Sequence, residues 1–299
     1  MYFYKNLAYF ELLYYFWHMV RQIIDIQSDV AVHTPFNSDQ LIVEISESNL
    51  TLMVKIGNST KVDALEVFDF DPANDDWFDV FYFARNSSNI LSRGYNATKI
   101  FFNLPEVVLV PNSLFDINHI NDYVEAIHGS TGTNITKSEK VGTSPDINVV
   151  YRISKSLFDM IHSNFMMVDT EHVYTSFIKR AINSPYSAGT FLKVQFYHHQ
   201  MVVALVQYGK LQIVQSFSFT VSDDVVYHLL NLSEQFNISI SQTDVELSGI
   251  IDEKATPYMH IKKLFAKVFF ETTEHTAEFT KANEEYPDYY FLPYLKLVV

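Results

Sequence analysis

The sequence contains no cysteine among its 299 residues. This absence excludes disulfide bonds, thiolate zinc sites and a cysteine nucleophile, and it favours a reducing, cytoplasmic setting. Basic residues are also scarce, with 21 Lys and Arg against 35 Asp and Glu, for a formal net charge of −14. Phosphate contacts dominate nucleic-acid affinity, so a chain this acidic, without a dense Lys/Arg cluster, is not expected to bind nucleic acid.

Long apolar runs are missing as well. Lys5, Glu11, His18 and Arg21 interrupt the aromatic N-terminal stretch MYFYKNLAYFELLYYFWHMVRQIID. It therefore lacks the run of about 20 apolar residues that a membrane-spanning helix needs, and it has no signal-peptide cleavage site. Three interpretations stay open: a helix that packs on the core or at an interface, a start codon assigned too far upstream, and an envelope anchor. We expect no integral membrane anchor and treat residues 1–37 as an N-terminal extension.

Catalytic signatures are absent too. There is no P-loop, no glycine-rich dinucleotide turn and no HExxH zinc motif. Ser113 and Ser248 lack the flanking residues of a nucleophile elbow, and the adjacent His198 and His199 do not have metal-ligand spacing. We therefore assign no catalytic residue and no metal ligand.

What the sequence does contain is alternating apolar segments. Leu41–Ile45 and Leu50–Ile56 alternate around the turn SESN, and Ala64–Phe70 follows as a third strand. A helix is predicted from about Asp75. The acidic residues 71–76 before it suit helix capping better than paired acid/base catalysis.

The same order of elements returns from residue 190. Three strands are predicted over TFLKVQFYHHQMVVALVQYGKLQIVQSFSF, followed by a helix from Ser222, a strand over Asp244–Ile251 and a helix from Thr256. Val43 and Val194 are 151 positions apart, and Phe70 and Phe219 are 149 apart. The repeat predicts a duplicated α/β chain of two mixed-sheet lobes around a central cleft, residues 38–183 and 184–299.

The region between the repeats has a weaker pattern. Thr98–Leu104 and Val107–Val110 are predicted to pair as strands, with a helix opening after Pro111. Gly129–Asp146 has no apolar periodicity and is predicted to be a mobile loop. Phe165–Val168 is predicted as a buried strand, and Thr170 as the cap of the next helix.

These patterns resemble the actin-like, ribonuclease-H-like ATPase fold. The resemblance rests on the order and spacing of IVEISESNLTLMVKI, VQFYHHQMVVALVQYGKLQIVQSFSF and DVELSGIID. The arrangement of these motifs is similar to that in the actin-like proteins of bacterial cell division and type IV pilus assembly. VVLVPNSLFD and EEYPDYYFLPYL resemble more closely a family of unknown function from Bacteroides-type bacteria with that fold. The resemblance covers residues 38–298.

The resemblance implies where a nucleotide would lie. Glu44 to Asn49 would form the first phosphate loop, Gln195 to Gln200 the second, and Ser248-Gly249 the adenosine-side turn. The implied cleft-lining residues are Glu44, Ser46, Glu47, Ser48, Gln195, Tyr197, His198, Ser248 and Gly249.

The two hairpins nevertheless lack the residues that phosphate binding needs. Active members of the wider fold have an Asp followed closely by Gly, because Gly lets backbone N–H groups approach phosphate and Asp holds hydrated magnesium. Here the hairpins read SESN and YHHQ, and Glu44 and Glu47 add negative charge. If His198 and His199 follow strand alternation, only one of them faces the cleft.

We therefore expect a non-enzymatic interaction or scaffold protein with degenerate phosphate loops and a protein partner. The alternative is a nucleotide-dependent switch that binds ATP and magnesium weakly. If the chain is an enzyme, the resemblance implies an ATPase. The aromatic C-terminal residues Tyr289, Tyr290, Phe291, Tyr294 and Leu295 are expected to form a last core strand or an exposed docking patch.

Overall fold

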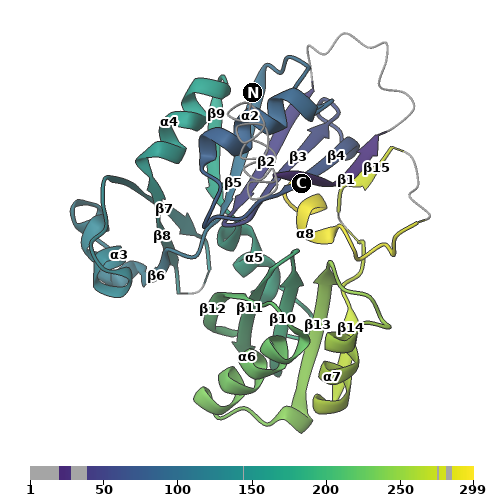
Figure 1. Ribbon diagram of the computed structural model, residues 1–299. Coiled ribbons are helices and arrows are strands. Elements are labelled where there is room, and N and C mark those ends of the chain that lie inside the picture. The colour runs from purple at the N-terminus through teal and green to yellow at the C-terminus, as the bar shows by residue number, and fades with distance from the viewer. Residues whose placement is uncertain (1–19, 28–38, 144, 275, 281–284) are drawn as a thin grey trace, which may run out of the picture. The chain divides into compact units, whose positions relative to one another are not determined.

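The computed structural model describes residues 20–27, 39–143, 145–274, 276–280 and 285–299, and Figure 1 draws them in colour. By its contacts the chain divides into two compact units. Unit 1 comprises Met1–Phe102, Ser154–Thr170 and Phe279–Lys281, and unit 2 comprises Asn103–Ile153, Glu171–Glu278 and Ala282–Val299. The lobes 38–183 and 184–299 are defined by the repeated elements rather than by contacts, and they stay a prediction.

The first sheet has seven strands and begins as an antiparallel meander. β2 (Gln40–Ser46), β3 (Asn49–Lys55) and β4 (Lys61–Asp69) pair in order, which confirms the three strands that the alternation predicts. The sheet order is β1-β4-β3-β2-β5-β9, with β15 also pairing with β4. Its other strands are β1 (Arg21–Gln27), β5 (Ala97–Asn103), β9 (Val168–His172) and β15 (Glu278–Phe279).

Two helices of unit 1 pack on each other. α2 (Trp77–Ser87) begins at Asp76, whose carboxylate accepts the N–H groups of Phe78 at 2.8 Å and Asp79 at 3.0 Å. The predicted capping role of the acidic stretch is therefore confirmed. α4 (Lys155–Asn164) lies beside α2, and the Arg85 guanidinium donates to the Asn164 carbonyl.

The second sheet, in unit 2, has five strands in the order β12-β11-β10-β13-β14. β10 pairs antiparallel with β11 and parallel with β13, and β13 pairs parallel with β14. The strands are β10 (Thr190–Phe196), β11 (Gln200–Gln207), β12 (Lys210–Ser218), β13 (Thr243–Gly249) and β14 (Lys267–Phe270).

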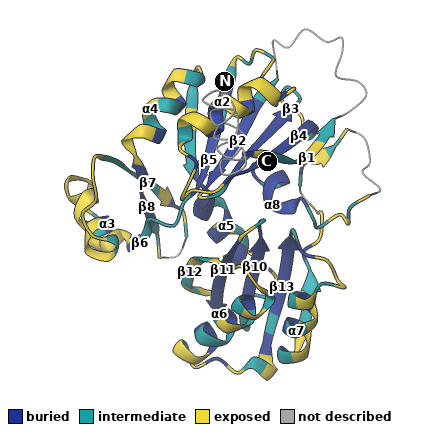
Figure 2. Ribbon diagram, in the orientation of Figure 1, coloured by how far each residue is buried: buried dark blue, intermediate teal, exposed yellow. Residues whose placement is uncertain are grey.

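The two faces of the second sheet differ in chemistry. Leu192, Val194 and Phe196 point to one face and form an apolar core with α6 (Ser222–Gln235) and α7 (Thr256–Leu264). Strand alternation places Lys193 and Gln195 on the opposite face, where α5 packs against β11 and β12 and α8 packs against β13. Figure 2 shows that β10, β11 and β13 are buried, whereas α6 and α7 keep exposed outer surfaces.

The two sheets share their strand order. β4-β3-β2-β5 in the first sheet corresponds to β12-β11-β10-β13 in the second. Each hairpin turn also accepts the same hydrogen bond from the end of its third strand. The Phe70 N–H donates to the Ser48 carbonyl at 2.9 Å, and the Phe219 N–H donates to the His199 carbonyl at 3.0 Å. The predicted mixed-sheet α/β fold class is confirmed.

A small three-stranded sheet corrects two expectations. It has the order β6 (Val107–Pro111), β8 (Ile147–Ser154), β7 (Asn134–Val141), beside α3 (Ile120–His128). The loop predicted over residues 129–146 is wrong for β7, whose lysine and glutamate residues hid its periodicity. β5 and β6 lie in different sheets, so the pairing predicted for them is wrong too. The helix predicted directly after Pro111 begins only at Ile120, after two short 3-10 turns.

The chain between α4 and α5 also differs from its prediction. No strand forms over residues 165–167, since Met167 adopts a φ of +48°, and β9 begins at Val168. α5 (Val173–Ile182) is capped by His172 rather than by Thr170, because the His172 Nδ1 accepts the Tyr174 N–H at 3.2 Å. The expected strand and helix are present, but both begin a few residues later than expected.

The N-terminal prediction is partly testable. Residues 1–19 lie outside the described part of the chain. Residues 21–25, expected to end a helix, belong instead to β1, an edge strand paired antiparallel with β4. The apolar Ile23, Ile24 and Ile26 suit a strand, and the Arg21 guanidinium lies 2.8 Å from the Asp69 carboxylate. No helix within the described ranges is long and apolar enough to cross a membrane.

The C-terminal aromatic residues form neither a strand nor an exposed patch. Leu292–Leu295 forms the short helix α8, and Phe291, Tyr294 and Leu295 are buried. Pro293 lacks the N–H that a strand would contribute but fits the first turn of a helix. These three residues therefore belong to the core as the first interpretation expected, but in and beside a helix rather than in a strand, and the exposed patch is wrong for them.

Candidate functional site

The first predicted phosphate loop is a tight turn. β2 ends at Ser46 and β3 begins at Asn49, so only Glu47 and Ser48 lie between the strands. The Asn49 N–H donates to the Ser46 Oγ at 3.0 Å, while the Ser48 carbonyl accepts the Phe70 N–H. Ser46 therefore serves to close the turn, and Glu47 is the exposed residue of the pair.

Glu44 lies inside the sheet rather than in the turn. It is fully buried, and its carboxylate accepts a hydrogen bond from Thr51 Oγ1 at 3.2 Å on the neighbouring strand. Asp69, which sequence reasoning did not single out, has a more direct relation to the turn. Its carboxylate accepts from Asn49 Nδ2 at 3.2 Å and from the Arg21 guanidinium. Asp69 ends the third strand, a position that the alternation pattern could have drawn attention to.

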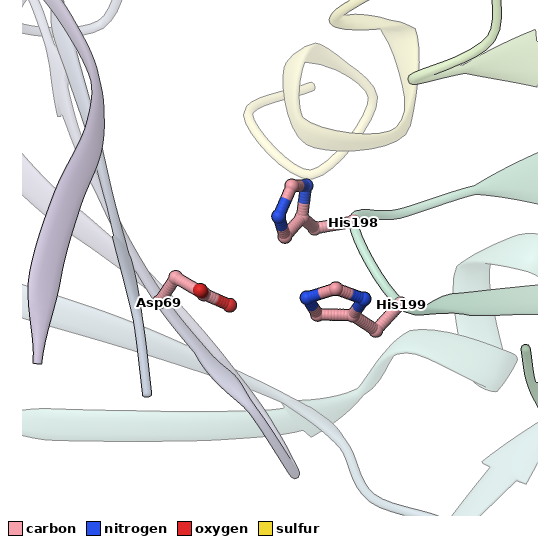
Figure 3. A group of neighbouring side chains, drawn as sticks. All are labelled: Asp69, His198 and His199. Atoms are coloured by element: carbon pink, nitrogen blue, oxygen red, sulfur yellow. The ribbon is translucent and has the colours of Figure 1, made fainter. Parts of the chain in front are cut away.

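The second predicted phosphate loop is a three-residue turn, Tyr197-His198-His199. The Tyr197 N–H donates to the Gln200 carbonyl at 2.8 Å. The rings of His198 and His199 lie with their centroids 4.2 Å apart at 64°. Figure 3 shows both rings extending from this turn, and Asp69 at the end of β4 in unit 1. The expectation that the two rings face opposite ways is wrong, because both residues belong to the turn, where strand alternation does not hold.

Neither turn contains a residue in the left-handed backbone region. A nest of N–H groups needs a residue in the left-handed region beside a right-handed one. Every residue of both turns is described, and none has a positive φ; within the described ranges the positive-φ residues other than glycine are Met167, Tyr208 and Asn237.

The predicted adenosine-side turn ends β13. Ser248 and Gly249 pair in parallel register with Gln195 and Phe196 of β10. Gly249 has a φ of +95°, and a Cβ at this position would lie 2.0 Å from the Phe196 carbonyl oxygen. Only glycine fits there, so its N–H direction is fixed by the fold. That N–H donates to the Tyr289 carbonyl at 2.9 Å.

A buried ion network lies beside this turn. Lys193 is 2% exposed, and its ammonium contacts the carboxylates of Glu246 and Glu271, the latter at 2.8 Å. The Lys296 ammonium lies 3.6 Å from the same Glu271 oxygen. Burial raises the pKa of Glu246, while Lys193 and Arg180 outweigh burial at Glu271 and hold its pKa below the ordinary value. Sequence reasoning missed this network, although Lys193 and Glu246 each stand between two apolar residues of a predicted strand.

The structure groups the candidate residues by unit. Glu44, Ser46, Glu47 and Ser48 belong to unit 1. Gln195, Tyr197, His198, Ser248 and Gly249 belong to unit 2, where β10 and β13 bring Gln195 beside Ser248. The cleft predicted between the lobes stays a prediction.

Similar solved structures share this fold. A protein from Bacteroides thetaiotaomicron VPI-5482, described as having an actin-like ATPase fold and unknown function, is 16% identical, with a TM-score of 0.67, over 79% of this chain and 91% of its own. The PilM–PilN type IV pilus biogenesis complex contains a chain that is 11% identical, with a TM-score of 0.52, over 78% of this chain and 88% of its own. These likenesses confirm the actin-like fold that the sequence motifs suggest.

No protein with a curated description matches this sequence. A family match does exist, and it spans most of the chain, from residue 33 to residue 268. The match includes both hairpins, Ser248-Gly249 and the start of strand β14. The chain belongs to the family described as "Protein of unknown function (DUF3822)".

Proposed function

We propose that this chain is a non-catalytic interaction or scaffold protein of the cytoplasm, which keeps an internally duplicated actin-like frame without nucleotide turnover. Its partner is another protein, and its phosphate loops are degenerate. The duplication accounts for the shared strand order of the two sheets and for the matching hydrogen bonds of Phe70 and Phe219.

The observation that carries the proposal is the closure of both turns by the chain's own hydrogen bonds. In the first turn, the Ser46 hydroxyl and the Ser48 carbonyl accept backbone N–H groups. In the second turn, the Tyr197 N–H donates to the Gln200 carbonyl, and the His199 carbonyl accepts the Phe219 N–H. The N–H groups of Asn49 and Tyr197, already engaged in turns without glycine, are poorly placed to receive phosphate oxygens.

Charge supports the same conclusion at the first turn. Glu47 is exposed there, and a phosphate about 4 Å from a carboxylate is opposed by roughly 4 kcal/mol at an effective dielectric of 20. His199 at the second turn is exposed and would attract an anion only when protonated. This histidine favours the alternative function, a switch that binds ATP weakly. The experiment below distinguishes that switch from the interaction or scaffold protein.

An interaction role is also consistent with one of the similar solved structures. The PilM structure is a complex with a second protein, PilN. We infer from this likeness that an actin-like frame of this size suits binding to another protein, and we assign this chain the same general role.

The test is a thermal-shift titration of the full chain with ATP and magnesium. A ligand at about 100 times its Kd stabilises the folded state by about 2.7 kcal/mol, which raises the Tm by several degrees. We expect no saturable shift. A saturable shift would contradict the proposal and favour the switch.

Two exposed charge changes form the control. Glu47→Lys makes the first turn more attractive to phosphate, and His199→Glu makes the second turn less so. If a nucleotide binds at these turns, Glu47→Lys strengthens the shift and His199→Glu weakens it. We expect neither variant to differ from the wild-type chain, while cross-linking of the native protein identifies a partner at a fixed stoichiometry.

A further inference from the structure

The end of the chain contacts the carboxyl ends of three parallel strands of the second sheet. We call residues 285–299 the C-terminal segment. At β13, the Gly249 N–H donates to the Tyr289 carbonyl at 2.9 Å. At β14, the Tyr289 ring stacks on Phe270, with centroids 3.7 Å apart at 12°. At β10, the Tyr197 and Tyr294 rings meet edge to face at 5.6 Å.

This edge has the features of a ligand site. In open α/β sheets, ligands bind beyond the carboxyl ends of the strands. The Gly249 N–H is fixed in direction by its φ of +95° and by its contact with Phe196. The Phe270 ring also belongs to a stack, because Tyr258 of α7 lies parallel to it with centroids 5.2 Å apart at 16°. A fixed donor beside a flat ring selects a planar group that carries an adjacent acceptor.

The C-terminal segment pairs with only some of the buried polar groups at this edge. Three buried polar atoms, one on each of the three strands or directly after it, have no hydrogen-bond partner within the described ranges: Gln195 Nε2, Ser248 Oγ and Glu271 Oε2. Gln195 and Ser248 are each 1% exposed and Glu271 is 9% exposed. Buried polar groups are normally paired, so three unpaired ones at one sheet edge point to a polar ligand that the segment does not fully replace.

We propose that the carboxyl edge formed by Gly249 and Phe270 is a docking site for an aromatic peptide segment, filled in cis by the C-terminal segment through Tyr289. The Tyr289 ring supplies the planar group and its own carbonyl supplies the acceptor. A partner peptide that also pairs with Gln195, Ser248 or Glu271 displaces the segment. The inference rests on the proposed function, since the C-terminal segment at this edge prevents a nucleotide from binding there. A protein partner gains access by displacing the segment.

The test compares Tyr289→Ala with the matched control Tyr290→Ala in the full chain. Tyr290 is the neighbouring tyrosine, and its ring contacts Tyr286 and Phe291 instead of Phe270. Loss of one aromatic stack is expected to raise the equilibrium constant for release of the C-terminal segment about tenfold. We expect hydrogen exchange at the Gly249 amide to rise about tenfold in Tyr289→Ala and to stay at the wild-type rate in Tyr290→Ala.

Binding of a labelled peptide of residues 285–299 is the second readout. We expect saturable binding to Tyr289→Ala and at least about tenfold weaker binding to the wild-type chain, whose own segment competes. An unchanged Gly249 exchange rate in Tyr289→Ala, or equal peptide binding by both chains, overturns the inference and leaves the proposed function intact. Binding of adenosine or ATP in place of the peptide overturns both.

Wild-type protein supplies a measurement that does not depend on a variant folding. If the segment is a displaceable occupant, its amides exchange through a local opening, faster than those of β10 and β13. If residues 285–299 exchange only together with these strands, the segment is part of the fixed core and the inference is wrong. Phe270→Leu, which keeps an apolar side chain but loses the flat ring, is expected to speed exchange in the segment as Tyr289→Ala does.

Discussion

The first and second sheets share a backbone plan but differ in what they bury. Ile42 of β2 and Lys193 of β10 are 151 positions apart, the offset that relates the repeats, and they are 1% and 2% exposed. The first sheet buries an apolar side chain at this position. The second buries an ammonium that contacts Glu246 and Glu271, and Glu271 in turn pairs with Lys296 near the chain's end.

The difference shows which features the two sheets have in common and which they do not. Strand order and the hydrogen bond from the third strand to the turn belong to the backbone, which tolerates little change. A side chain on a sheet face can differ if its neighbours differ with it, as the ion network of the second sheet illustrates. That network connects β10, β13 and the residue after β14 to the C-terminal segment, a connection that the apolar Ile42 side chain cannot make.

The largest expected difference in the free energy of unfolding is between substitutions of Lys193 and of Ile42. Lys193→Met leaves two buried carboxylates without their shared cation and is expected to lower the free energy of unfolding by about 3–5 kcal/mol. Ile42→Met, the matched change in the first sheet, is expected to cost less than about 1.5 kcal/mol. Urea denaturation measures both.

Adding Glu246→Gln to Lys193→Met is expected to recover part of the loss, since Glu246 then carries no unpaired charge while Glu271 keeps Lys296 as its partner. Equal effects of the two methionine substitutions, or no recovery in the double variant, would show that Lys193 acts through packing alone.

The next effect compares the caps of α2 and α5. Asp76 caps α2 with a carboxylate, whereas α5 is capped by the imidazole of His172, whose Nδ1 accepts the Tyr174 N–H and whose Nε2–H therefore donates to the Leu104 carbonyl at 3.1 Å. Burial lowers the pKa of His172 from 6.5 to about 4. Below pH 6.5 the unfolded chain takes up a proton that the folded chain does not accept until about pH 4. Stability is therefore highest above pH 6.5 and falls by about 3 kcal/mol towards pH 4.

His172→Asn keeps a good capping acceptor but does not titrate. We expect this variant to be less stable at pH 7 and to show a shallower decline between pH 6.5 and 4 in urea midpoints measured across that range. Parallel pH profiles for the wild-type chain and His172→Asn would remove His172 as the cause.

A smaller effect compares the two hairpin turns. Ser46→Ala removes the acceptor of the Asn49 N–H in a buried turn and is expected to cost about 1–2 kcal/mol. The second turn is closed through backbone groups, so His198→Ala is expected to cost no more than about 0.5 kcal/mol. Thermal denaturation of both variants checks the difference, and a reversed order would mean that the histidine rings hold the second turn.

The smallest effects belong to the exposed residues of the turns. Glu47→Lys and His199→Glu are each expected to change the free energy of unfolding by less than about 0.5 kcal/mol. Circular dichroism melts measure these changes. A larger loss from either variant would show that its turn depends on the charged side chain as well as on the backbone.

Much of the fold was predictable where one sheet face is apolar. The strands around both hairpins, α2 with its Asp76 cap, and α6 and α7 all follow from local periodicity. β7 was missed because lysine and glutamate occupy it, and its Glu139 is stabilised by partners distant in the sequence. The Glu139 carboxylate accepts from Thr175 Oγ1 at 2.6 Å and from the His172 N–H at 2.9 Å.

The candidate site was predictable only as a set of positions. The missing glycines at both turns were visible in the sequence, whereas the hydrogen bonds that close the turns were not. The contact between Tyr289 and Gly249 joins residues 40 positions apart, and no local pattern indicates it. Aromatic residues near the chain's end indicated burial or docking, but not that a short helix would place them against the second sheet.

By itself, the sequence determined the alternation of strands and helices, the repeated order and the absence of glycine from both turns, because these depend on residues close to one another along the chain. Only the tertiary structure decided that Lys193 lies between two carboxylates, that His172 is buried as a cap, and that Tyr289 covers Gly249. The physical reason is that burial and charge pairing are set by whichever segments meet across a sheet, and those segments are distant in sequence.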